Sequence, residues 1–349
     1  MKIGPYELKI PLIQGGMGVG VSLGNLAGHV AFNHCMGVIS SAQIGFKEKD
    51  FYTNTKKANL RAIDQEIKKA KQIASGNGII AMNIMTALSD YKDHVVQSVK
   101  SGADAIISGA GLPLKLPEYV NKETLIAPIV SSGKAAGLIL KSWDRHYHRI
   151  ADFIVIESSL AGGHLGFKKT DLINQTCQSL EEILKDVKEI IIEFALKYHK
   201  SIPIFVAGGI FDSKDIRHFM MLNADGVQIG TRFIGTHECD ASPIYKNAFI
   251  QAKKEDITLV TSPVGMPGRA MRNVFILKTE KGKIPIHRCF RCISSCDVIH
   301  APYCITEALI RAVNGDLDNG LIFTGSNGYR IDKIISVKEL INELKGAFI

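Results

Sequence analysis

The sequence lacks a long run of apolar residues free of charge. Its longest candidate, residues 124–140, contains Lys134, although apolar residues make up 46% of the chain and charged residues 22%. This balance is typical of a globular protein, whereas a membrane-spanning helix needs about 20 predominantly apolar residues in succession. The first residues, MKIGPYELKIPLIQGG, also lack the apolar segment and small-residue cleavage site of a signal peptide. We therefore expect no membrane association and a cytoplasmic location.

The sequence also lacks a concentrated basic tract, although its formal net charge is +8. The lysines are spread along segments of helical period, such as TKKANLRAIDQEIKKAKQIA, where they alternate with acidic residues. Such alternation is typical of a solvated helix surface rather than of a nucleic-acid-binding patch. We expect no nucleic-acid partner.

A disulfide framework is not expected either. The chain contains seven cysteines, an odd number, and without a signal peptide reduced thiols or metal ligands are favoured. Four of them, Cys289, Cys292, Cys296 and Cys304, have the spacing C-x₂-C-x₃-C-x₇-C. This spacing predicts a [4Fe–4S] cluster or a tetrahedral zinc site, with unliganded cysteines as the alternative.

Short apolar runs rich in β-branched residues alternate along the chain with segments of helical period. There are eight such runs: KIPLIQ, MGVISSA, GIIAMNIM, ADAIISGA, LIAPIVSS, DFIVIESS, IPIFVAGGI and GVQIGTRF. Runs that are apolar on both faces are typical of parallel strands covered by helices. Eight of them predict an α/β fold, a (β/α)₈ TIM barrel, with a doubly wound open sheet as the alternative.

This pattern also suggests a division of the chain. We place the barrel in residues 1–235. A smaller lid region on the substrate side, which contains the cysteine segment, is expected in residues 236–349. The end of the chain is expected to pack back on the barrel.

Glycine and polar residues collect at the C-terminal end of almost every predicted strand. They are Gln14-Gly15-Gly16, Ser40-Ser41, Asn83, Ser108-Gly109, Ser131-Ser132, Glu157-Ser158, Gly208-Gly209 and Gly230-Thr231. In a TIM barrel these ends form the face on which active sites lie, whereas ordinary turn chemistry would explain one such end but not all of them. The glycines after the last two strands lie where barrels commonly bind phosphate through backbone N–H groups. A phosphorylated ligand is therefore expected.

Six motifs, in this order, resemble the nitronate monooxygenase family, formerly called 2-nitropropane dioxygenases: PLIQGGMG, AMNIM, AGGHLG, VAGGI, VQIGTRF and GMPGRAMRN. The flavin-dependent enoyl-acyl carrier protein reductases are close relatives of that family. The resemblance extends from about Ile10 to Asn273 and resumes in GLIFTGSNGYRIDKI. It implies an FMN-binding barrel that oxidises alkyl nitronates with O₂ to a carbonyl compound and nitrite.

The resemblance also implies roles for single residues. Backbone at Gly16 and Met17 would lie against the isoalloxazine, and Asn83 would hydrogen-bond the flavin. Gly162 and Gly163 would let the histidine loop pass close to the ring. The other cofactor-binding residues would be Glu157, Gly208, Gly209, Gln228, Gly230 and Thr231.

His164, within AGGHLG, is the predicted catalytic residue. Histidine near its unperturbed pKa exchanges protons, or pairs as a cation with an anion, around neutral pH, and a nitronate is a small anion. The alternative is a loop histidine that only hydrogen-bonds backbone. The sequence departs from the commoner family pattern at Ser158 and Leu160, where many members have glycine and an acid, and this leaves the substrate open.

Two other functions stay open at this point. A flavin-dependent enoyl-acyl carrier protein reductase would use NAD(P)H and an acidic carrier partner, which the basic net charge would attract. A flavin-binding regulatory protein would have no turnover. The expected partners are otherwise a small-molecule substrate and O₂, with a homodimer as one possible assembly.

Overall fold

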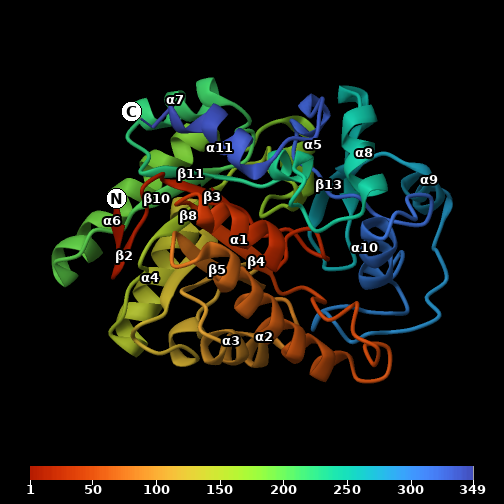
Figure 1. Ribbon diagram of the computed structural model, residues 1–349, viewed down its shortest axis with the longest axis horizontal. Helices are drawn as coiled ribbons and strands as arrows, with labels where there is room; N and C mark the ends of the chain where they lie inside the picture. The colour runs from red at the N-terminus through yellow and green to blue at the C-terminus, as the bar shows by residue number, and fades with distance from the viewer. Residues whose placement is uncertain (349) are drawn as a thin grey trace.

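The computed structural model describes residues 1–348 and contains a closed barrel of eight parallel strands (Figure 1). In chain order the strands are β3 (Leu12–Gln14), β4 (Met36–Ser40), β5 (Ile79–Met85), β6 (Ala105–Gly109), β7 (Leu125–Val130), β8 (Ile154–Glu157), β10 (Ile204–Ala207) and β11 (Gly226–Ile229). Each pairs with the next, and β11 pairs with β3 to close the ring. The predicted TIM barrel is confirmed, each strand lies within one of the eight predicted runs, and closure excludes the open sheet.

The strands are apolar on both faces because both faces are buried. Inward-facing side chains from seven strands fill the barrel. Among the core residues, Phe153, just before β8, and Phe205 of β10 meet edge to face with ring centroids 5.7 Å apart. A short hairpin, β1 (Lys2–Ile3) and β2 (Tyr6–Glu7), adds Ile3 and Leu8 to this inner core. The interior is thus a packed core, which leaves the strand ends as the place for a ligand.

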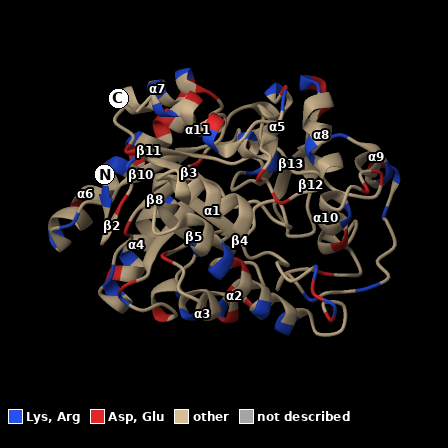
Figure 2. Ribbon diagram, viewed as in Figure 1, with Lys and Arg blue, Asp and Glu red and all other residues tan. Residues whose placement is uncertain are grey.

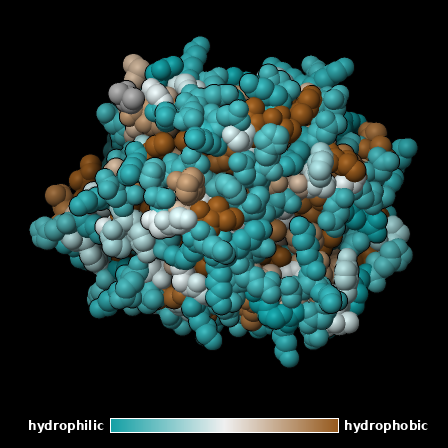
Figure 3. All heavy atoms as spheres, in the orientation of Figure 1, coloured by the Kyte–Doolittle hydropathy of each residue, from teal (hydrophilic) through white to brown (hydrophobic). Residues whose placement is uncertain are grey.

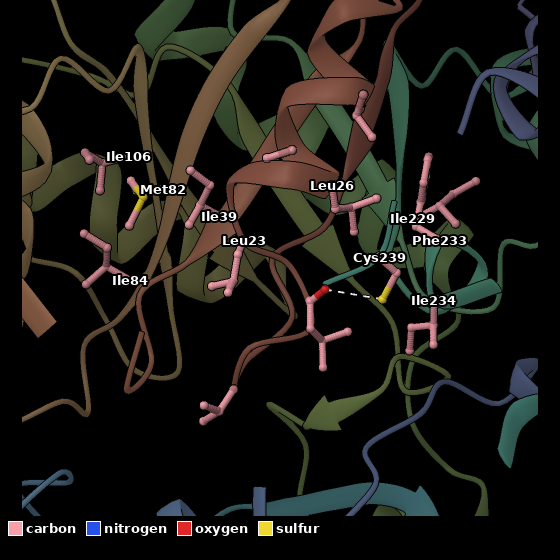
Figure 4. Packing of buried hydrophobic residues seen from close by; sticks show 14 of the residues in the cluster. Leu23, Leu26, Ile39, Met82, Ile84, Ile106, Ile229, Phe233, Ile234 and Cys239 are labelled. Atoms are coloured by element: carbon pink, nitrogen blue, oxygen red, sulfur yellow. Dashed lines mark hydrogen bonds between the residues drawn. The ribbon is translucent and has the colours of Figure 1, made fainter. Parts of the chain in front are cut away.

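Seven helices surround the strands. They are α1 (Gly24–Phe32), α2 (Thr55–Ala74), α3 (Tyr91–Lys100), α4 (Gly133–Tyr147), α6 (Leu180–Tyr198), α7 (Ser213–Met221) and α11 (Val337–Lys345). Their apolar faces form a second core with the outward-facing side chains of the strands. Figure 4 shows part of it, in which Leu26, Ile39 and Ile229 belong to one cluster and the Cys239 thiol donates to the Val21 carbonyl at 3.4 Å.

Helix boundaries follow ordinary capping chemistry. Asp212 caps α7, where its carboxylate accepts from the backbone N–H groups of Lys214 and Asp215. Ser179 and Glu182 form a capping box at the start of α6.

One barrel helix is missing. Residues 110–124, between β6 and β7, contain only a 3₁₀ turn, η1 (Leu116–Glu118). Pro113 and Pro117 lie in this segment, and proline lacks the N–H that a helix interior requires. The connection is therefore a loop, and the Pro113 carbonyl accepts a hydrogen bond from the indole of Trp143 on α4 at 3.0 Å.

The chain after the barrel forms a second layer at the strand ends. Its elements are η2 (Thr231–Gly235), α8 (Pro243–Gln251), η3 (Lys254–Asp256), β12 (Ile257–Thr261), β13 (Pro267–Met271), α9 (Val274–Lys281), α10 (Ile305–Val313) and η4 (Gly328–Arg330). Strands β12 and β13 form an antiparallel sheet with β9 (Gly163–His164), which belongs to the loop after β8 and precedes α5 (Lys169–Asn174). The chain then returns to the barrel, where α11 contacts α1 and α7.

Charges of both signs are interspersed over the surface helices (Figure 2), and the face in Figure 3 is mostly hydrophilic with scattered apolar patches. Within residues 1–348, no helix combines the length and the apolar character needed to cross a membrane.

Candidate functional site

A cavity lies at the C-terminal ends of the barrel strands. It encloses about 1430 Å³ that protein atoms do not fill, part of which is open to solvent. Its walls come from strand ends and from the second layer, including Asn83 of β5, Glu157 of β8, Gln228 of β11 and Phe323 of the C-terminal segment. A cleft lined by apolar side chains and a few convergent polar groups is typical of a ligand site.

The structure brings together on this cavity every residue predicted for the flavin site. They are Gly16, Met17, Asn83, Glu157, Gly162, Gly163, His164, Gly208, Gly209, Gln228, Gly230 and Thr231. They come from loops and strand ends far apart in the sequence, so their convergence follows from the barrel and not from local spacing.

His164 is held by the second layer. It lies on β9 beside Gly268 of β13, and its Nε2 is 2.7 Å from the Ser262 hydroxyl oxygen. The edge-to-face contact with Phe323 has a centroid distance of 5.0 Å. Burial lowers the pKa of His164 to about 4. Burial therefore favours the neutral imidazole at neutral pH, and the catalytic role of His164 stays a prediction.

The two glycines before His164 are required for different local reasons. A Cβ at Gly162 would lie 2.5 Å from the backbone of Thr324 and Gly325, so glycine permits a close approach of the C-terminal segment. Gly163 has a φ of +71°, which side chains other than glycine rarely adopt, and open space where a Cβ would be. The glycines thus allow the histidine loop to contact the second layer and leave the cavity side of the loop clear.

Several polar side chains on the cavity have no partner in the protein. Within residues 1–348, no hydrogen bond holds the side chains of Asn83, Glu157, Gln228 or Tyr245, although Gln228 and Tyr245 are almost fully buried. Burial raises the pKa of the Glu157 carboxyl to about 7. Since buried polar groups in proteins are nearly always paired, this set indicates a place for a polar ligand.

The loop of residues 323–327 packs on the ends of the last two barrel strands, where the sequence predicts a phosphate site. The backbone N–H of Gly325 donates to the Thr231 hydroxyl at 2.9 Å, and the Asn327 amide donates to the Gly209 carbonyl at 2.6 Å. The N–H of Ser326 donates to the Leu160 carbonyl at 3.1 Å. This loop links the last barrel strands to the histidine loop.

A largely buried guanidinium holds the loop that leads to His164. Arg269 of β13 donates from Nη1 to the carbonyl oxygens of Ser159 and Ala161 at 2.7 and 2.6 Å. Both carbonyl groups belong to the three residues before Gly162. Arg269 therefore holds the backbone segment that leads to His164.

Sequence reasoning missed the residues of the second layer that reach the cavity. Ser262, Phe323, Tyr245 and Leu309 carry no local motif, and Ser262 is 98 residues away from the histidine it contacts. The segment GLIFTGSNGYRIDKI, which contains Phe323, carries only the family resemblance and no motif that indicates a contact with the cavity. Its role at the cavity became visible through its contacts with Thr231 and Gly209.

The predicted metal site is not supported. Among residues 1–348, no group of three or more His, Cys, Asp or Glu side chains is arranged to hold a metal ion. Cys289 is exposed, Cys292 lies beside the Thr306 hydroxyl, and Cys304 accepts from the backbone N–H groups of Thr306 and Glu307 at the start of α10. Cys296 is half-buried. The thiols lie near enough to raise one another's pKa values, but they do not form a group arranged to hold a metal ion.

Other contacts hold the cysteine segment. The Phe290 ring stacks on Phe51 with centroids 5.6 Å apart, and the Cys292 carbonyl accepts from the Ser89 N–H at 3.1 Å. Ile293 forms a bridge with Leu88. Apolar packing and backbone hydrogen bonds therefore account for the position of this segment.

Comparisons with known proteins agree with this fold. The model of the nitronate monooxygenase family matches residues 1–346. A probable nitronate monooxygenase of Bacillus subtilis (strain 168) is 23% identical over 367 residues, which covers 97% of this chain and 96% of that protein. Another curated relative, 28% identical, is matched over only 52% of its own length.

Two solved structures share the fold. FabK from Thermotoga maritima has a TM-score of 0.72 at 23% identity, with coverage of 98% of this chain and 94% of that one. Nitroalkane oxidase from Streptomyces ansochromogenes also has a TM-score of 0.72, at 18% identity, with coverage of 98% and 96%. Because the family model matches nearly the whole length, the chain belongs to the nitronate monooxygenase family.

Proposed function

We propose that this protein is an FMN-dependent oxidoreductase that oxidises alkyl nitronates with O₂ to a carbonyl compound and nitrite. Membership in the nitronate monooxygenase family supports an oxidoreductase. The observation that carries the proposal is the cavity in which unpartnered polar side chains, strand-end glycines and one neutral imidazole meet. Bound FMN would supply the electron-accepting and oxygen-reactive chemistry that side chains lack.

The residues present fit such a cofactor. Asn83 and Gln228 offer unpartnered amides for the polar edge of a flavin or for its ribityl chain. Gly208 and Gly209 have φ values of +92° and +81°, so their backbone runs where a residue with a Cβ would be strained. With Thr231 they form the strand-end position at which barrels commonly bind phosphate.

The chain's own part would be to orient the substrate and exclude water. The cavity lining also includes apolar side chains, among them Met85, Ile129, Leu160 and Phe323, and the last of these contacts His164. A neutral His164 beside these side chains can hydrogen-bond a nitronate oxygen without a net charge. This arrangement would hold the substrate in one orientation within a low-dielectric site.

Reconstitution with FMN tests the proposal directly. We expect the purified protein to bind noncovalent FMN and to turn yellow. Anaerobic addition of propyl nitronate should then bleach the flavin absorption, and aerobic turnover should release nitrite. A protein that takes up no FMN, or bound FMN that propyl nitronate fails to reduce, would contradict the proposal.

A second candidate is an enoyl reductase that uses NADH or NADPH. The apolar wall of Met85, Ile129, Leu160 and Phe323 favours it, because this wall suits an acyl chain at least as well as a short nitronate. In the same anaerobic experiment, reduction by NADH or NADPH and reoxidation by an enoyl thioester would identify this activity. Bound flavin that neither reductant bleaches would instead indicate a regulatory flavoprotein.

A further inference from the structure

The partner of His164 is a serine on a different part of the chain. Ser262 follows β12 directly and is 3% exposed, and its hydroxyl oxygen lies 2.7 Å from Nε2 of His164. Strand β13 lies between the two, paired with β12 on one side and with β9 on the other. The sheet therefore sets the distance between the serine and the histidine.

The hydrogen-bonding capacity of Ser262 decides which way this bond runs. A serine hydroxyl has one proton to donate and accepts through its lone pairs. Its oxygen already accepts from the backbone N–H of Val264 at 3.3 Å. Within residues 1–348, the only other polar atom bonded to the hydroxyl is Nε2 of His164. If Nε2–H donated to this hydroxyl, the buried serine proton would have no acceptor among these residues, and leaving a buried donor unpaired is costly. The arrangement in which the serine donates to an unprotonated Nε2 is therefore favoured.

The other ring nitrogen is available to a ligand. Within residues 1–348, Nδ1 of His164 has no hydrogen-bond partner. Unlike the ring nitrogens of His94, which are fully buried and unpaired, Nδ1 of His164 is not fully buried. His164 lines the cavity, and the edge-to-face contact with Phe323 limits rotation of its ring. A ligand in the cavity would therefore meet Nδ1.

We propose that Ser262 is a positioning residue that holds neutral His164 with its proton on Nδ1, so that Nδ1–H donates a hydrogen bond to a substrate oxygen. The substrate would carry an acceptor oxygen, such as a nitronate oxygen or a thioester carbonyl. The identity of the substrate rests on the proposed function, whereas the proton position does not. The lowered pKa of His164 agrees with a neutral ring.

Nitrogen NMR measures the proton position without turnover. In protein labelled with ¹⁵N-histidine, with His164 assigned through the loss of its signals in His164→Gln, we expect the chemical shifts of an Nδ1–H tautomer at pH 7. Ser262→Ala should give a mixture of both tautomers, and Ser262→Thr should restore the Nδ1–H form. Thr258→Val, on the same strand, is the matched control and should leave the signals unchanged.

The opposite tautomer in the wild-type protein would overturn the proposal, and so would an unchanged spectrum in Ser262→Ala. If Ser262→Ala does not fold, Ser262→Thr and Ser262→Cys still test it, since Thr keeps the hydroxyl and Cys replaces it with a weak donor. The Cys variant should then resemble the Ala expectation.

Amide substitutions at His164 test the same point in the FMN-loaded enzyme. An asparagine amide nitrogen takes the place of Nδ1, whereas a glutamine amide nitrogen takes the place of Nε2. We expect His164→Gln to lose about 10²- to 10⁴-fold in kcat, the usual range for proton-transfer or hydrogen-bond donors, and His164→Asn to lose clearly less. Ser262→Ala should lose about tenfold in kcat with little change in KM, the equivalent of one hydrogen bond.

Equal losses in His164→Asn and His164→Gln would contradict the role of Nδ1. An Nδ1–H tautomer in a protein that fails to oxidise propyl nitronate would refute the proposed substrate and leave the serine–histidine pair intact. The two proposals can thus fail separately.

Discussion

The barrel and the second layer contribute different kinds of groups to the cavity. The barrel contributes strand ends, with backbone N–H groups and polar side chains such as Asn83, Glu157 and Gln228 that have no protein partner. The second layer contributes groups that contact His164 or its loop, namely Ser262, Phe323 and Arg269. The barrel thus offers unpaired groups to a ligand, and the second layer holds His164 in position.

Under the proposed function, this difference would separate the residues that hold the cofactor from those that position the histidine. Strand ends of a TIM barrel offer a site that many chemistries share, and loops vary what happens there. In this chain the imidazole of His164 has its hydrogen-bond partner on the second layer, in a segment that follows the last barrel strand. We therefore expect changes in the barrel to affect ligand binding and pH dependence, and changes in the second layer to affect the histidine.

The barrel side is tested most strongly at Glu157. Its pKa is raised to about 7 by burial, so the carboxylate is stabilised less in the folded than in the unfolded protein. A raised pKa contributes stability that is fully present below the unfolded value near 4.5 and is lost as the pH rises through about 7. Glutamine does not ionise, so Glu157→Gln should not lose stability in this way. At pH 8.5 its free energy of unfolding should exceed that of wild type by up to about 3 kcal/mol.

Urea unfolding of flavin-free protein between pH 4 and pH 9 measures this effect. Near pH 4 the variant and the wild type should coincide. Glu255→Gln, an exposed carboxylate on η3, is the control and should follow the wild-type curve at every pH. A Glu157→Gln curve parallel to wild type over this pH range would show that the carboxyl is not buried as described.

The contact between the two regions is tested at Gly162. In Gly162→Ala the new Cβ would lie 2.5 Å from the backbone of Thr324 and Gly325, so the histidine loop and the C-terminal segment must move apart. Forced displacement of packed backbone costs about 1–3 kcal/mol, and His164 should lose its fixed distance to Ser262. We expect a lower free energy of unfolding and a His164 tautomer mixture in the NMR experiment.

FMN affinity should change less than turnover in this variant, because the strand ends stay in place. Gly346→Ala is the matched control, since its Cβ would meet nothing within 4 Å. Turnover equal to wild type in Gly162→Ala would show that the contact between the regions does not position the histidine.

The sequence predicted the barrel because each strand has a local signature. Buried parallel strands are apolar on both faces, and their ends are marked by glycine and polar residues, so MGVISSA or IPIFVAGGI can be recognised alone. The cavity residues of the barrel followed, because the C-terminal ends of parallel strands meet on one face. His164 was found for the same reason, through the glycines next to it.

The second layer could not be predicted in this way. The contact of Ser262 with His164 depends on the pairing of short antiparallel strands across 98 residues, and nothing near Ser262 indicates it. The neutral state of His164 depends on burial by that layer, which single-residue chemistry does not reveal. The cysteine spacing is compatible with a metal site, but spacing does not fix the directions of the side chains, and in the described residues these thiols form no group arranged to hold a metal ion.

The second layer itself is tested at Tyr303. This residue is 2% exposed, its hydroxyl donates to the Thr261 carbonyl at 3.1 Å, and its ring meets Phe275 edge to face at 5.1 Å. Tyr303→Phe keeps the ring contact and removes one hydrogen bond between the start of α10 and β12. The free energy of unfolding should fall by about 1 kcal/mol. The effect should appear in the second layer first, because local openings report the stability of the unit that contains the bond.

Hydrogen exchange should therefore speed up in β12, β13 and α10 while the barrel strands keep their protection. The control Tyr52→Phe, at a residue that is 45% exposed, should change exchange in neither region. Equal acceleration in barrel strands would mean that the two regions unfold as one unit, and the distinction between a ligand-binding barrel and a histidine-positioning layer would then hold for chemistry but not for stability.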